Sequence, residues 1–79
     1  MNVLTVVREN TEKRARREEL DRRREQLEQL KAQIAAVEME YQQLTDDLLI
    51  ESQIYALMSL RARYRFLYAE LRRDTEAVV

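Results

Sequence analysis

The sequence predicts an all-α protein built from long helices that pack as a coiled coil, and three observations support this prediction. The 79 residues include no Gly and no Pro, the residues that tight turns and helix C-termini commonly use. Charged residues make up 37% of the chain, which is typical of long solvated helices. Apolar residues also recur at alternating spacings of three and four, which is the pattern of a helical seam.

The N-terminal half predicts a short apolar segment, 1–7, followed by a first helix over 8–44. Between residues 8 and 26 Leu20 is the only large apolar side chain. Several Glu residues precede a cation by four positions in this stretch, an arrangement that stabilises a solvated helix. Asn10 or Thr11 could cap the start of the helix, and Thr5 is a further candidate.

A heptad seam begins at residue 27. Its core positions are Leu27, Leu30, Ile34, Val37, Tyr41, Leu44 and Leu48, and none of them is charged. A second series follows one residue out of phase, at Ile50, Ile54, Leu57, Arg61, Tyr64, Tyr68 and Leu71. The predicted coiled-coil seam comprises the first series together with Ile50, Ile54 and Leu57.

The phase break predicts a turn at 45–47 and a second helix over 48–77. Thr45 is a good N-cap, and Asp46 and Asp47 suit the positive end of a helix dipole. Residues 20–44 and 48–71 are nearly equal in length, so they could pack side by side as an antiparallel hairpin. The alternative is one continuous helix of about 110 Å in a coiled-coil dimer.

The second helix carries more apolar surface than one neighbouring helix can cover. Leaving several such side chains in water forfeits about 1.5–3 kcal/mol each, so we expect the hairpin to oligomerise into a helical bundle or to bind a helical partner. We expect the partner contact at residues that cluster Tyr and Arg, the types enriched in binding hot spots. These are Arg61, Tyr64, Arg65, Tyr68, Leu71 and Arg72.

Charge is segregated along the chain although the net charge is only −1. Residues 13–24 and 61–73 are basic, and residues 25–60 are acidic with Lys31 as the only cation. In a hairpin that turns at 45–47, both basic blocks would meet at the open end. These basic blocks could serve only to keep the helices soluble and to match the negative end of a helix dipole. Alternatively, they could attract an acidic partner.

The composition excludes several kinds of chemistry. The chain has no Cys and no His, so it offers no thiolate nucleophile, no imidazole base, no thiolate metal site and no Glu-x-x-His metal motif. We therefore expect no enzyme activity, no cofactor and no metal. No apolar run approaches the roughly 20 residues of a membrane span, and we expect a cytoplasmic protein, with a nuclear, phage or viral origin left open.

These features predict a non-enzymatic structural or adaptor protein that self-associates and binds other helical proteins, as a small subunit of a larger assembly. One alternative is a nucleic-acid-binding coiled coil that uses the two basic blocks. Its resemblance to a basic zipper is poor, because Glu12, Glu18 and Glu19 interrupt the basic arm. The other alternative is a small chaperone that masks a client helix.

Overall fold

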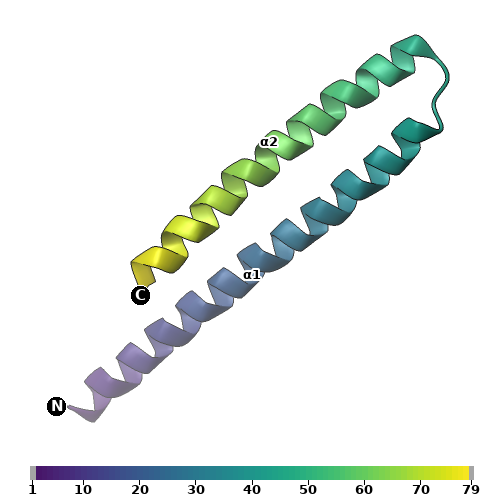
Figure 1. The fold of residues 1–79 in the computed structure, drawn as a ribbon. Helices are drawn as coiled ribbons and strands as arrows, with labels where there is room; N and C mark the ends of the chain where they lie inside the picture. The colour runs from purple at the N-terminus through teal and green to yellow at the C-terminus, as the bar shows by residue number, and fades with distance from the viewer. Residues whose placement is uncertain (1, 79) are drawn as a thin grey trace.

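The computed structural model describes residues 2–78, which form a helical hairpin (Figure 1). Helix α1 spans Val3–Gln42, helix α2 spans Asp47–Val78, and residues 43–46 connect them. The two helices run antiparallel in a molecule of 68 × 17 × 14 Å. The prediction of an all-α hairpin is confirmed, and the alternative of one continuous helix is wrong.

Helix α1 begins earlier than the sequence predicted. Asn2 is its N-cap, with the side-chain Oδ1 accepting a hydrogen bond from the Leu4 amide at 3.1 Å. The amides of Thr5 and Val6 donate to the Asn2 carbonyl. Residues 3–7 are therefore the first turns of α1 rather than a separate segment. Thr11 lies within the helix, where its hydroxyl donates to the Val7 carbonyl at 2.9 Å.

The connection between the helices needs no glycine. Gln43 ends α1 in an ordinary right-handed conformation, φ −97° and ψ −7°, and its amide donates to the carbonyls of Glu40 and Tyr41. The Leu44 amide donates to Tyr41 as well, at 3.2 Å. None of residues 2–78 has a positive φ, so the chain reverses using conformations that any L-residue adopts.

Helix α2 is capped by Asp46 rather than by Thr45. Oδ1 of Asp46 accepts hydrogen bonds from the amides of Leu48 at 2.9 Å and Leu49 at 3.1 Å. The Ile50 amide then donates to the Asp46 carbonyl. These bonds satisfy donors that a helix N-terminus otherwise leaves unpaired. Asp47 follows in the first turn, where the helix dipole favours a negative charge.

The helices meet along one stripe of each. The most buried side chains are Leu20, Leu27 and Leu30 of α1 and Leu57 of α2. Further half-buried apolar side chains continue the contact on both helices. They are Ile34, Val37 and Leu44 on the α1 side and Ile50, Ala56, Leu60, Tyr64, Leu67 and Leu71 on α2.

The α2 stripe departs from the predicted series at alternate positions. Tyr64 and Leu71 are half-buried as predicted, but Leu60 and Leu67 are half-buried in place of the exposed Arg61 and Tyr68. The first four predicted seam residues, Leu27, Leu30, Ile34 and Val37, are buried or half-buried against the other helix, whereas the next one, Tyr41, is exposed. Leu48 and Ile54 are 76% and 41% exposed, outside the contact within the hairpin.

Polar contacts fix how far the helices slide past one another. Near the open end Arg23 pairs with Asp74. Toward the turn, Arg61 donates to Glu38 at 2.8 Å, and Gln53 donates to Glu40 at 3.0 Å. Arg61 of the basic block 61–73 therefore lies beside an acidic α1 residue, and the block 13–24 reaches the other block only at its end, where Arg23 pairs with Asp74. The two basic blocks adjoin at their ends but do not lie side by side along their lengths.

The N-terminal part of α1 extends beyond the end of α2 (Figure 1). Every residue from 3 to 18 is exposed, and we call this stretch the N-terminal extension. It carries an apolar tip, with Val3 at 75% and Leu4 at 74% exposure. No helix in the described part of the chain is long and apolar enough to cross a membrane.

Candidate helix-docking surface

Helix α2 carries apolar side chains on two faces, and α1 covers only one of them. The uncovered face bears Tyr55, Met58 and Phe66, which are 63%, 58% and 60% exposed, together with the exposed Ala62 and Ala69. We call these five residues the outer stripe. Their spacing of three, four, four and three keeps them within about 80° of helix circumference, at 3.6 residues per turn.

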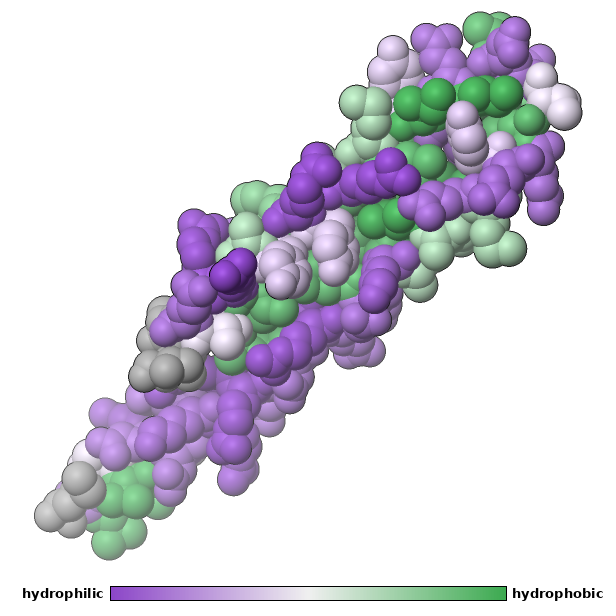
Figure 2. All heavy atoms as spheres, in the orientation of Figure 1, coloured by the Kyte–Doolittle hydropathy of each residue, from purple (hydrophilic) through white to green (hydrophobic). Residues whose placement is uncertain are grey.

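The outer stripe has the properties of an interface rather than of scattered surface residues. A helix whose apolar residues continue around its circumference is normally covered on more than one side. Continuous exposed apolar patches mark sites of protein association. Figure 2 shows apolar side chains at the surface toward the turn end of the molecule, edged by polar side chains. Aromatic residues and Met are also the types enriched in protein interfaces.

Beside the outer stripe, a groove of about 360 Å³ opens between the helices near the turn. Three predicted seam residues, Tyr41, Ile54 and Leu57, line this groove together with Met58 of the outer stripe. The groove is bordered by Glu38 and Arg61, which are paired with each other. Apolar surface that the hairpin itself leaves open therefore continues from the outer stripe into the groove.

The predicted partner interface is divided between two faces of α2. Tyr64 and Leu71 are half-buried in the contact with α1. Tyr68 is 50% exposed, and its ring stacks on Tyr64 with centroids 6.2 Å apart and planes inclined by 18°. Arg61 is engaged with Glu38, and the exposed Arg72 contacts Glu76 at 3.4 Å on its own helix. Arg65 is exposed.

The excess apolar surface of the second helix was predicted from the sequence, but the residues of the outer stripe were not singled out. The signal that identifies them is a second three-four series in α2, displaced from the first by about half a helical turn. Phe66, flanked by Arg65 and Leu67, belongs to this second series. Two such series on one helix indicate two helix contacts.

Charge changes sign along α2. Its first half carries Asp47 and Glu51 without a cation before Arg61, and residues 61–73 carry five Arg and one Glu. Several of these Arg side chains remain well exposed while pairing along the helix, such as Arg73, 3.9 Å from Glu70. The outer stripe therefore begins in the acidic first half of α2 and continues into the basic second half.

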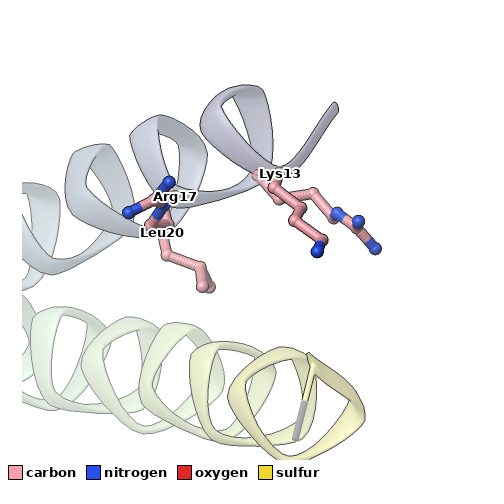
Figure 3. Close-up of a pocket in the computed structure, with 4 residues that line it drawn as sticks. Lys13, Arg17 and Leu20 are labelled. Carbon is pink, nitrogen blue, oxygen red and sulfur yellow. The ribbon is translucent and has the colours of Figure 1, made fainter. Parts of the chain in front are cut away.

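A second concentration of charge lies where α1 passes the end of α2. A shallow hollow of about 290 Å³ is lined by Lys13, Arg16, Arg17 and Leu20. Figure 3 shows Leu20 pointing from α1 toward the last turns of α2, with Lys13 and Arg17 closer to the N-terminus.

Further along α1, the basic side chains are held by neighbouring acids. Arg22 donates to Glu19 at 2.6 Å, Arg23 donates to the other oxygen of Glu19 at 3.3 Å, and Arg24 pairs with Asp21 at 3.1 Å. The hydrogen bond and charge of Arg22, assisted by Arg23, lower the pKa of Glu19. The same contact raises the pKa of Arg22.

The part of the chain that the structure describes holds no cluster of acidic side chains that could bind a metal ion. No protein-family model, no curated protein and no solved structure matches the chain. The proposed function is therefore argued from the outer stripe of α2 and the groove beside it.

Proposed function

We propose that this protein is a non-enzymatic coiled-coil structural or adaptor protein whose outer stripe on α2 packs against another helix. The observation that carries the proposal is the exposure of Tyr55, Met58 and Phe66 along one face of a helix already packed on its other face. Covering such side chains contributes up to about 1.5–3 kcal/mol each, which favours association of a small hairpin.

The modest core of the hairpin supports the same proposal. Leu20, Leu27, Leu30 and Leu57 are its buried residues, and each helix touches a single neighbour. Two-helix units of this size are marginal without further burial. A further helix against the outer stripe would cover the second apolar face of α2 and add to the buried apolar surface.

A photo-crosslinking amino acid in place of Phe66 tests the proposal. In cells that produce the protein, irradiation should yield an adduct in which a helical segment of a protein is joined to residue 66, identified by mass spectrometry of the linked peptides. The matched control is the same group at Ala36, an exposed position of α1 on the side away from the seam. Absence of any adduct at 66, or equal adducts at 66 and 36, would reject the outer stripe as a helix-docking surface.

Nucleic-acid binding by the basic residues is the second candidate, and the hollow beside Lys13, Arg16 and Arg17 favours it. The pairing of Arg22, Arg23 and Arg24 with acidic side chains weighs against it. Binding to a random duplex, measured at two salt concentrations, separates the candidates. A nucleic-acid-binding protein loses affinity steeply as salt rises, whereas a helix-docking protein should show no duplex binding at physiological salt.

A further inference from the structure

The outer stripe is nearly symmetric about its centre. Met58 and Phe66 lie four residues on either side of Ala62, and Tyr55 and Ala69 lie seven residues on either side. Four residues rotate the position around the helix axis by about one turn plus 40°, and seven residues by about two turns minus 20°. All five residues therefore remain on one face. A two-fold axis at Ala62 would place Met58 against Phe66 twice and Tyr55 against Ala69 twice.

The pairs so formed are complementary in size and chemistry. A small residue at the axis allows close approach of the two helices, and a large side chain opposite a small one lets the layers interdigitate. Methionine sulfur against an aromatic ring is a favourable contact. A two-fold interface requires this kind of self-complementary surface.

The charges follow the same symmetry. Glu51 and Arg73 lie eleven residues on either side of Ala62, a spacing that returns to the same face within about 20°. Both side chains are exposed. The antiparallel arrangement places the acidic first half of each α2 beside the basic second half of the other. A parallel arrangement would place the five Arg residues of 61–73 against their own copies, which is destabilising.

We propose that the occupant of the outer stripe is a second copy of this chain, with the two α2 helices antiparallel about an axis at Ala62. The two hairpins then pack as a row of four helices, with the two α2 helices at the centre and one α1 helix on each outer side. The inference rests on the proposed function, because it names the helix that packs on the outer stripe.

Introduced cysteines test the arrangement, since the natural chain has none. Glu51→Cys and Arg73→Cys proteins, mixed under mild oxidation, should form a mixed disulfide between copies. Each variant alone should form disulfide dimers about tenfold more slowly. Within one chain these positions are about 33 Å apart along the helix, too far for a disulfide. Ser52→Cys mixed with Arg73→Cys is the control, because residue 52 is rotated by about 100° from residue 51.

Charge reversal gives an independent readout that needs no oxidation. Glu51→Arg should weaken the dimer about tenfold, because each dimer contains the pair twice and attraction becomes repulsion. Arg73→Glu should do the same, and the double variant should return the dissociation constant to within about threefold of the natural value. The double variant keeps the changes within each chain, including the altered contact between residues 70 and 73, so recovery reports contact between copies.

The outcomes that overturn the inference differ from those that overturn the proposed function. A monomeric mass at tens of micromolar, rapid disulfide formation by Glu51→Cys alone, or failure of the double reversal to recover would each overturn the antiparallel dimer. A crosslink from residue 66 to a different protein would also overturn it while leaving the outer stripe as a helix-docking surface. Absence of any crosslink from residue 66 would overturn both.

Discussion

Leu27, Leu30 and Leu57 are the most buried side chains of the hairpin, so they lose the most contact with water when the two helices pack. Each lies at the line of contact, where it is covered from both helices. Their neighbours one residue along the chain, such as the exposed Gln29, contribute little to that contact. Stability should therefore be concentrated in few positions.

Truncation of Leu30 tests this concentration. Leu30→Ala should lower the free energy of unfolding by about 2–3 kcal/mol, the lower part of the range for buried leucines, because the seam is open at its edges. Gln29→Ala should change it by less than about 0.5 kcal/mol. Urea unfolding followed by circular dichroism measures both. Equal effects of the two changes would show that the interhelical contact lies elsewhere.

Glu19 offers a prediction of pH dependence at the same scale. Its pKa is lowered in the folded state by Arg22 and, less strongly, by Arg23. The stabilisation by this contact is thus fully present above the ordinary pKa of glutamate and is lost as pH falls through the lowered value. A carbon-detected NMR titration of the Glu19 carboxyl should show the low pKa. Arg22→Gln should raise it, and Arg14→Gln should not. An unchanged Glu19 pKa in Arg22→Gln would contradict the assignment of cause.

At the scale of the helices, the sequence predicted α1 more accurately than α2. The α1 seam is unambiguous because its apolar positions stand alone among polar residues. In α2 apolar residues adjoin one another, as in Leu67-Tyr68, so either neighbour can continue the three-four series. The predicted series accepted Arg61 although Leu60 precedes it, and the structure turns Leu60 toward α1. A charged residue within an apolar series was the available signal that the register was displaced.

The start of α2 could not be settled from the sequence for a related reason. Thr45 and Asp46 are both good N-cap residues, and only the packing of the helix decides which of them stands at its end. The half-buried Ile50 and the Asp46 hydrogen bonds fix the helix start at Asp47. Asn2 carried a local signal as well, because Asn is a preferred N-cap residue, but the apolar residues that follow it have no partner within the hairpin and so did not mark the start of a seam.

Replacing the caps separates Asp46 from Thr45. Asp46→Ala should lower the free energy of unfolding by about 1 kcal/mol, because two amide donors of α2 lose their acceptor. Thr45→Ala should have an effect several times smaller. Midpoints of chemical unfolding for the two variants provide the measurement. The reverse order of effects would place the helix start one residue earlier.

For the whole molecule, the antiparallel topology brings residue 26 closer to residue 72 than to residue 52, whereas in one straight helix residue 72 would be the farther of the two. Residue 26 lies near residue 72 across the hairpin, because Arg23 pairs with Asp74 nearby. Residue 52 lies close to the turn, 20 positions before residue 72 and therefore about 30 Å away along α2. The N-terminal extension adds length to one side only, so the molecule is two helices thick over most of its length and one helix thick at its end.

Spin labels on cysteines at 26 and 72, in protein diluted with unlabelled chains, should give a distance of about 20 Å or less, within two helix diameters. Labels at 26 and 52 should give the longer distance. A continuous helix would reverse the order, with roughly 39 Å for 26–52 and 69 Å for 26–72. Double electron–electron resonance resolves this difference, and the reversed order would reject the hairpin in solution.

The step at which α1 emerges from beside α2 also has a mechanical consequence. Resistance to bending rises steeply with the cross-section of a rod, so a paired-helix shaft is much stiffer than the single helix that continues from it. The ion pair of Arg23 with Asp74 and the buried Leu20 clamp the base of the single-helix arm. Under thermal agitation or an applied load, we expect curvature to concentrate just beyond Leu20. The N-terminal extension would then bend about its base near Leu20, and its apolar tip at Val3 and Leu4 would move over a wider range of positions than the paired helices.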